Sequence, residues 1–150
     1  MKRWPNRGWM SPRVQCFVWK ILNHRLPTRM FLAERGVAVL QIQDNCVCCT
    51  SGPETQEHLL AACPSLQPLL QNLCRFLWIS LRQGDYEHIQ QLLINHNSNS
   101  LRKQTLQMVV AYTLWTWWKA RNELNFQQKD LDFNNIWRNA HTQIYEQLLL

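Results

Sequence analysis

Three cysteines and one histidine occur within 18 residues of this chain, in the order Cys46-x2-Cys49-x8-His58-x4-Cys63. Two cysteines separated by two residues can both reach one ion, because a tight turn between them points both sulfurs inward. Three thiolates and one imidazole are a common tetrahedral ligand set of structural zinc sites. The spacing therefore predicts that all four residues bind one Zn2+ ion and that the surrounding fold depends on this ion.

The chain has six cysteines, so the ligand set has alternatives. Cys48 lies next to Cys49, and Cys46-x-Cys48 is an alternative pair with a less usual spacing. We prefer Cys49 because a two-residue spacer is typical of zinc sites. Cys16 and Cys74 stand singly inside helical patterns, and we expect them to be small packing residues.

The second ligand pair needs a local departure from regular helix. His58 and Cys63 are five residues apart and would point in different directions on an ideal helix. Pro64 disfavours helical geometry at Cys63, which lets this sulfur turn back toward His58. Gly52-Pro53 predicts the chain reversal that brings the two pairs together. A closed site of four protein ligands leaves no position for an activated water, so the predicted role is structural.

Hydrophobic periodicity predicts a mainly α protein. Only 4 glycines and 6 prolines interrupt the 150 residues, which favours long helices over many short strands. Thr28 is the expected N-cap of a short helix, and Gly36 the residue that ends it. We expect an irregular start (1–12), an extended piece (37–45), a linker (97–100) and helices at 13–26, 28–35, 54–62, 66–81, 86–95, 101–126 and 133–148.

These elements suggest two parts. Residues 1–80 would form a small helical zinc-binding domain of the Cys3His type, with a basic N-terminal arm. Residues 81–150 would form a helical extension, in which the last two helices make a long antiparallel hairpin joined by a polar turn at 129–132. The helix at 66–81 is apolar on most sides and should be buried.

Basic residues are concentrated at the N-terminal end. Residues 1–35 carry a formal net charge of +7, whereas the remaining 115 residues carry −1. A local basic patch suits a polyanion such as RNA or single-stranded DNA, although a solvated helix face is the simpler alternative. The residues that we predict to contact phosphate are Arg13, Lys20, Arg25, Arg29 and Arg35.

Eight tryptophans are a high number for this length. Trp115, Trp117 and Trp118 could stack on unpaired bases beside Lys119 and Arg121. However, Trp115 and Trp118 share one helix face, and aromatic residues at helical spacing usually belong to a core. We therefore favour a core role for this block. Trp4 and Trp9, beside Arg3 and Arg7, are better candidates for stacking.

The order of several motifs resembles the zinc-binding domain that follows the polymerase in plant LINE-type non-LTR retroelements and in derived stand-alone proteins. The resemblance covers about residues 4–80. A second block, 114–126, resembles the helical segment that often follows this domain. The motifs of the first block are Ser11-Pro12-Arg13-Val14-Gln15-Cys16-Phe17-Val18-Trp19-Lys20, Leu26-Pro27-Thr28, Leu32, Arg35-Gly36, Cys46-x2-Cys49, Glu54-Thr55, His58-Leu59-Leu60 and Cys63.

The resemblance implies a nucleic-acid-binding accessory module with Zn2+ as its metal and a reverse transcriptase as its partner. Two alternatives stay open: a zinc-stapled helical scaffold, in which residues 101–150 bind another protein, and a retroelement remnant without function. We expect an intracellular protein of the nucleus or cytoplasm, because no signal peptide and no apolar stretch of about 20 residues is visible.

We expect no catalysis by the chain itself. Polymerases and nucleases need clustered carboxylates to hold divalent metal ions. The ten acidic residues are scattered, and neither Glu54/Glu57 nor Asp130/Asp132 has partners that would complete such a site. The sequence also lacks a glycine-rich phosphate loop and the GxSxG and HExxH motifs.

Overall fold

The computed structural model describes residues 10–37, 44–94 and 100–149. Within these ranges the chain is helical and contains no strand; one isolated antiparallel bridge pairs Asn45 with Pro53. This confirms the predicted mainly α class. The elements are α1 (Pro12–Leu22), α2 (Arg29–Glu34), a π turn η1 (His58–Ala62), a 3-10 turn η2 (Pro64–Leu66), α3 (Gln67–Leu77), α4 (Tyr86–Leu93), α5 (Leu101–Gln127) and α6 (Phe133–Leu148).

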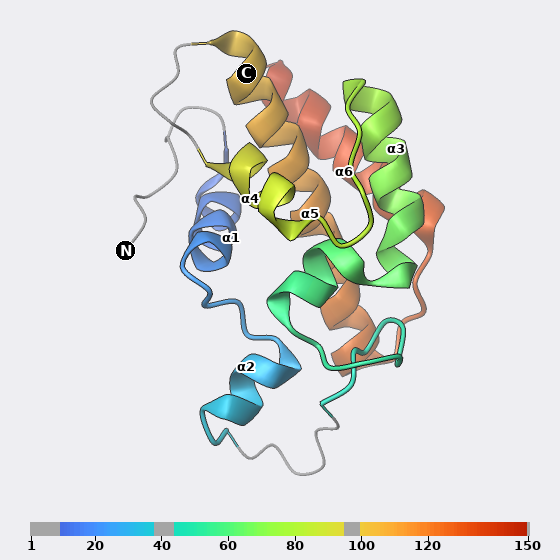
Figure 1. The fold of residues 1–150 in the computed structure, drawn as a ribbon. Helices are drawn as coiled ribbons and strands as arrows, with labels where there is room; N and C mark the ends of the chain where they lie inside the picture. Colours follow the sequence, from blue (N-terminus) through green and yellow to red (C-terminus); the bar gives the residue numbers. More distant parts are fainter. Residues whose placement is uncertain (1–9, 38–43, 95–99, 150) are drawn as a thin grey trace.

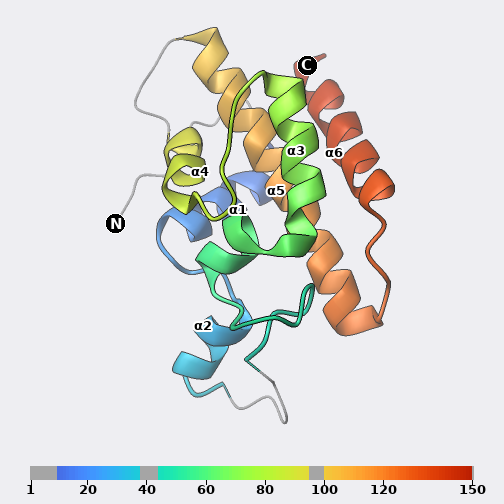
Figure 2. The ribbon, with the colours of Figure 1, turned by 45° about the vertical axis from the view of Figure 1, so that its right-hand side comes forward.

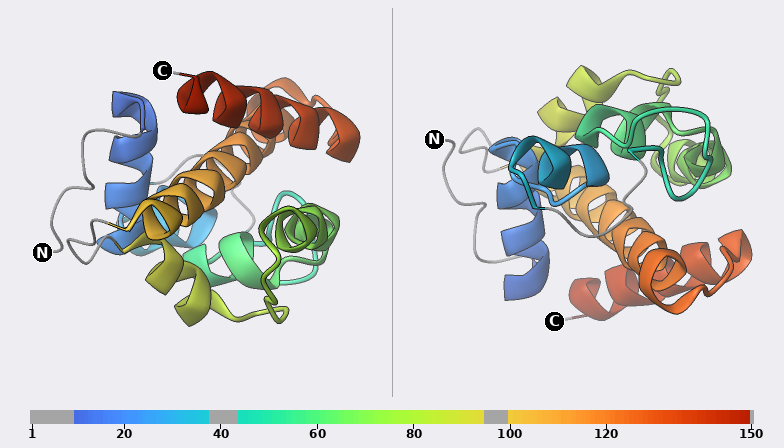
Figure 3. Two further views of the ribbon diagram at one scale, coloured as in Figure 1. Left: turned by 90° about the horizontal axis from the view of Figure 1, so that it is seen from above. Right: turned by 90° about the horizontal axis from the view of Figure 1, so that it is seen from below.

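Helix α5 forms the centre of the molecule. It contacts α1, α3, α4 and α6, and seen from above, α1 lies on one side of it and α3 and α4 lie on the other (Figure 3). Every side chain from Gln107 to Leu114 is buried. A helix that is covered on all sides belongs in the interior, so α5 supplies the surface on which the other helices assemble.

The predicted hairpin of two long helices is present. Helix α6 runs back along α5 in the opposite direction (Figures 1 and 2). Asp132 caps the first turn of α6, because its carboxylate accepts a hydrogen bond from the Asn135 N–H at 3.1 Å. An aspartate at this position satisfies a helix donor that has no partner within the helix.

A single core connects the two predicted parts of the chain. The cluster of buried residues runs from Met10 to Ile144 and includes side chains from every α-helix except α2. The indole N–H of Trp117 on α5 donates to the Leu59 carbonyl at 3.0 Å. The predicted division after residue 80 therefore does not coincide with a break in the core.

Both ends of the short helix α2 match the sequence prediction. The Thr28 hydroxyl accepts a hydrogen bond from the Phe31 N–H at 3.3 Å. Gly36 has φ +64°, and its N–H and that of Val37 donate to carbonyls of the last helical turn. This is a Schellman C-cap, for which glycine is favoured because it has no Cβ.

Helix α1 ends four residues earlier than predicted. His24 takes a left-handed conformation with φ 52°, and the Arg25 N–H donates to the Lys20 carbonyl at 2.8 Å. The helix therefore ends at Leu22 in a Schellman cap with histidine at the position where glycine is usual. The Leu26-Pro27 pair, from which we predicted the end, lies in the connection to α2.

The prediction for residues 66–81 was wrong in two respects. Helix α3 ends at Leu77, because Trp78 adopts a left-handed conformation with φ 55°. Only one face of the helix is buried, through Leu69, Leu70 and Leu73. The opposite face lies at the protein surface, so a mostly apolar sequence here marks an amphipathic helix.

Some predictions fall outside the described residues: most of the irregular start, the extended piece apart from its ends, three residues of the linker, and Trp4 and Trp9. Among the residues that are described, no helix combines the length and the apolar character needed to cross a membrane.

Candidate metal centre

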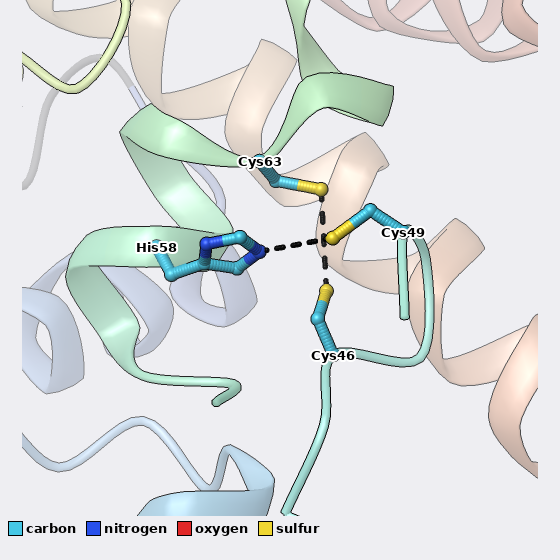
Figure 4. A group of neighbouring side chains, drawn as sticks. All are labelled: Cys46, Cys49, His58 and Cys63. Atoms are coloured by element: carbon cyan, nitrogen blue, oxygen red, sulfur yellow. Dashed lines mark hydrogen bonds between the residues drawn. The ribbon is translucent and has the colours of Figure 1, made fainter. Parts of the chain in front are cut away.

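The four predicted ligands converge on one point. The Sγ atoms of Cys46, Cys49 and Cys63 and a ring nitrogen of His58 all lie within 4.8 Å of one another. The Cys46 and Cys63 sulfurs are 3.9 Å apart, and the Cys49 sulfur is 3.2 Å from His58 Nε2. Figure 4 shows the three sulfurs and the imidazole pointing toward a common centre. This group could hold one metal ion.

The first ligand pair lies on a small hairpin. Around the Asn45–Pro53 bridge, the Cys46 N–H donates to the Gly52 carbonyl at 2.7 Å. The chain turns at residues 47–50, where Thr50 has φ 57° and donates its N–H to the Cys46 carbonyl at 2.9 Å. The reversal that we placed at Gly52-Pro53 thus occurs earlier, and these two residues form the returning arm.

The second ligand pair lies on either end of a π turn. The Cys63 N–H donates to the carbonyl of His58 at 2.7 Å, a hydrogen bond that spans five residues. A π turn holds more residues per turn than an α-helix, so side chains five apart come to the same side. Cys63 has ψ 124°, in agreement with the extended geometry that we predicted before Pro64.

Burial and mutual contact perturb the thiols. Cys46 and Cys63 are fully buried. Hydrogen bonds from the Cys48 and Cys63 thiols lower the pKa of Cys46 far below its ordinary value. The contact with Cys46, followed by burial, raises the pKa of Cys63. A divalent ion would offset the repulsion among three thiolates at this site.

Cys48 lies beside the ligand group but is not part of it. The hydrogen bond to Cys46, followed by burial, raises the pKa of the Cys48 thiol. Its backbone carbonyl accepts a hydrogen bond from the Ser65 hydroxyl at 3.1 Å, which ties the turn to the segment after Cys63. The geometry therefore agrees with our preference for Cys49 over Cys48.

This geometry predicts opposite results for two neighbouring substitutions. Cys49→Ser should abolish stoichiometric metal binding, because a serine hydroxyl stays protonated at neutral pH and is a poor ligand. Cys48→Ser should retain it. Elemental analysis of the two purified proteins measures the metal content per chain. Metal loss from Cys48→Ser alone would instead identify Cys48 as the ligand.

A buried carboxylate connects the metal hairpin to the central helix. Glu54 is 0% exposed and forms an ion pair with Arg121 of α5, which is 2% exposed. The second contact of this pair, from Arg121 Nε to Glu54 Oε2, measures 3.2 Å. The same carboxylate accepts backbone N–H bonds from Val47, in the metal hairpin, and from Arg29, at the start of α2, at 3.2 and 3.0 Å.

Sequence reasoning missed this role of Glu54 and Arg121. Glu54 was weighed only as part of a carboxylate pair with Glu57, and Arg121 only as a group that could stack on bases. The two residues are 67 positions apart, so spacing could not link them. Both residues belong to motif blocks of the family resemblance, and this was the one sequence signal that could have pointed to a role for them.

The structure separates the five predicted phosphate-binding residues. Arg13 and Lys20 line a groove between α1 and α5. Arg25 and Arg35 are exposed, with their guanidinium groups over the rings of Trp19 and Phe31 at 5.8 and 3.6 Å. Arg29 differs from these four residues, because its guanidinium group is engaged within the protein. It donates to the carbonyl of Asn45 and to the side chain of Asn125 at 2.9 and 3.0 Å.

The tryptophans of α5 differ in their surroundings. Trp117 is fully buried, Trp118 is 8% exposed, and Trp115 is half-buried. A core role is therefore observed for Trp117 and Trp118. The central residue is Trp117, not a member of the Trp115/Trp118 face that we expected to be the core.

A comparison with known protein families agrees with a metal site at these residues. Residues 2–69 match the family model described as zinc-binding in reverse transcriptase. This segment contains all four residues of the metal group. No curated protein and no solved structure gives a significant match to the chain. The family match and the ligand geometry agree, and residues 2–69 are therefore similar to the zinc-binding domain of reverse transcriptases.

Proposed function

We propose that this chain is a zinc-ordered, nucleic-acid-binding accessory module of the kind that supports retroelement reverse transcription, without catalysis of its own. One observation carries the proposal: the eight basic residues of 1–35, where the formal net charge is +7, all lie in the family-matched segment, and most of the predicted contact residues are accessible on or beside α1 and α2. The partner of the module would be RNA or single-stranded DNA, handled together with a reverse transcriptase.

Zinc is the proposed metal because of the donor set and its spacing. Zn–S bonds of about 2.3 Å and Zn–N bonds of about 2.0 Å at tetrahedral angles place two sulfurs about 3.8 Å apart and a sulfur and a nitrogen about 3.5 Å apart. The separations of 3.9 and 3.2 Å lie close to these values. Four protein ligands complete the tetrahedron, so the ion would stabilise the fold and would not activate water.

The metal would also orient the basic surface. The metal hairpin holds Glu54 through the Val47 N–H, and the Glu54 carboxylate holds the first turn of α2 through the Arg29 N–H. The Arg29 side chain fixes the same turn to Asn45 and to Asn125 of α5. Helix α2 has no buried residue of its own, so its orientation depends on these contacts.

Binding to single-stranded RNA or DNA should weaken as salt concentration rises. Each phosphate contact releases about 0.7 counterion from a single strand, so four contacts, by Arg13, Lys20, Arg25 and Arg35, predict a slope of roughly −3 in log affinity against log salt. Fluorescence anisotropy of a labelled oligonucleotide over a series of salt concentrations measures the slope. A flat curve would contradict nucleic-acid binding through this surface.

A matched pair of variants locates the binding surface. Arg35→Gln should weaken binding and make the slope shallower by about 0.7. Arg138→Gln, which removes an exposed charge from α6, should leave both unchanged. Equal losses in the two variants would mean that total charge, and not this surface, controls binding.

A protein-interaction scaffold is the second candidate. Trp78, Leu148 and Leu149 are exposed apolar side chains on or next to α3 and α6, with Trp78 94% exposed. Removing residues 101–150 would not isolate this function, because α5 holds the core together. Trp78→Ser tests it better: loss of self-association or partner binding with intact oligonucleotide binding would favour the scaffold.

A further inference from the structure

A groove with a volume of about 240 Å³ lies between α1 and α5, away from the metal ligands. Its walls combine two kinds of side chain, aromatic and basic. The lining residues are Arg13, Cys16, Phe17 and Lys20 of α1, Leu26 and Pro27 of the following connection, and Trp115 and Trp118 of α5.

The aromatic wall of the groove is held in place by its neighbours. The Phe17 ring lies 5.4 Å from the Trp115 ring and 6.4 Å from the Trp118 ring, measured between centroids. The guanidinium of Arg121, itself fixed by Glu54, lies 5.0 Å from the Trp118 ring centroid. Phe17 and Trp118 are buried, whereas Trp115 is half-buried and has ring surface left for a ligand.

The charge at the groove is positive. Arg13 and Lys20 are seven residues apart on α1, which separates their Cα atoms by about 10 Å along one face of the helix. Among the described residues neither forms an ion pair, and no acidic side chain lines the groove. Lys119 adds a third positive charge, because its Nζ lies 5.7 Å from the Trp115 ring centroid.

We propose that this groove binds one unpaired nucleotide of a single-stranded nucleic acid, an inference that rests on the proposed function. The base stacks against Trp115, and the phosphates on either side of it contact Arg13 and Lys20. Aromatic side chains stack on any base, whereas the paired cations require the phosphodiester chain. Neither a neutral apolar ligand nor a free metal ion matches this combination.

Size and geometry restrict the ligand further. Pockets for drug-sized ligands measure roughly 300 to 1,000 Å³, so a groove of this volume suits a single planar ring system. A base inside a duplex is already stacked and paired, and its extrusion costs energy. The groove should therefore discriminate against duplex RNA and DNA, which simple charge attraction would not do.

The test combines a protein variant with a modified ligand. Trp115→Leu keeps an apolar side chain but removes the aromatic face, and it should lower affinity for a single-stranded oligonucleotide by about 5- to 100-fold. An abasic oligonucleotide of the same length keeps every phosphate and removes the bases. Wild-type protein should bind the abasic oligonucleotide more weakly than the normal one by a similar factor. The Trp115→Leu variant should bind the abasic oligonucleotide with the same affinity as wild-type protein does. Anisotropy titrations with RNA and DNA versions of both ligands measure these factors.

A second tryptophan provides the control. Trp137 on α6 is also half-buried, but it contacts Phe76 and His141 and does not line the groove. Trp137→Leu should retain wild-type affinity. If Trp115→Leu binds as tightly as wild type, or loses as much affinity for the abasic ligand as for the normal one, the groove assignment is wrong while the proposed function stands. If wild-type protein binds neither ligand, the proposed function fails as well.

Discussion

Replacing Cys46 with serine is expected to remove the metal ion and to unfold the segment from the metal hairpin to the second ligand pair, residues 44–66. The Cys46 sulfur is fully buried and lies 3.9 Å from that of Cys63. Serine at this position leaves three ligands and a buried hydroxyl without a metal partner. In the hairpin that carries Cys46 the sheet pairing is one isolated bridge, so the order of this hairpin should depend strongly on the ion.

The expected effect is large because metal binding is coupled to folding. A structural zinc ion contributes an apparent binding free energy of about 10 to 16 kcal/mol at neutral pH. The whole unfolding free energy of a small domain is about 5 to 15 kcal/mol. The central helices share one core, so most of the helical circular dichroism signal should remain while the metal segment loses its structure. Limited proteolysis should show new cleavage between residues 44 and 66, and metal analysis should show an empty protein.

Cys74→Ser is the matched control. Cys74 is half-buried in α3 and belongs to no metal group among the described residues. The Cys74→Ser substitution removes one thiol from the chain, as Cys46→Ser does, and it should leave the metal content and the proteolysis pattern unchanged. A Cys46→Ser protein that still holds one equivalent of zinc would contradict the assigned ligand set.

The metal site could be predicted from sequence because its ligands are close together in the chain. Four donors lie within 18 residues, and the two-residue spacer between Cys46 and Cys49 is typical of zinc sites. The π turn between His58 and Cys63 could not be predicted, because a single five-residue hydrogen bond leaves no periodic pattern. Pro64 correctly predicted that the backbone at Cys63 is extended, but it did not indicate the π turn before Cys63.

Helix ends were predictable where one residue determines them. Gly36 and Thr28 are favoured for physical reasons that act within one turn, and the structure uses both. His24 and Trp78 end their helices in the left-handed conformation, at positions where glycine is the usual residue. The surrounding contacts decide these two positions, so local sequence could not indicate them.

The central position of α5 was only partly visible in the sequence. The tryptophans at 115, 117 and 118 indicated a core role for this helix, but the choice of the buried tryptophan depended on which helices surround it. Trp117 is the most buried because α5 is covered on several sides and its indole N–H finds the Leu59 carbonyl. Such a contact joins residues 58 positions apart, and no sequence pattern encodes it.

Arg121→Met should be the most damaging substitution outside the metal ligands. Removing the guanidinium leaves the Glu54 carboxylate buried, with only the Val47 and Arg29 N–H groups as described partners. Breaking a buried ion pair in this way typically costs about 3 to 5 kcal/mol. Urea denaturation with zinc in excess measures the unfolding free energy and separates this loss from the loss of metal.

An exposed ion pair provides the contrast. Lys129 and Glu123 lie 3.3 Å apart and are largely accessible, so Lys129→Met should change the unfolding free energy by less than about 1 kcal/mol. If Arg121→Met costs as little, the Glu54 carboxylate does not depend on its charged partner.

The double variant Glu54→Gln/Arg121→Met identifies the cause of the loss. Because the amide is neutral, the double variant should be more stable than the sum of the single losses predicts. Part of the loss should remain, because the Arg29 and Val47 N–H groups bond to different carboxylate oxygens and the amide keeps only one oxygen. The zinc affinities of the variants should rank in the same way as their unfolding free energies. The ion pair fixes the hairpin that carries Cys46 and Cys49, so an uncompensated charge at Glu54 disturbs the metal ligands as well as the core. Recovery of zinc affinity in the double variant would show that the central helix and the metal centre are coupled through this one carboxylate.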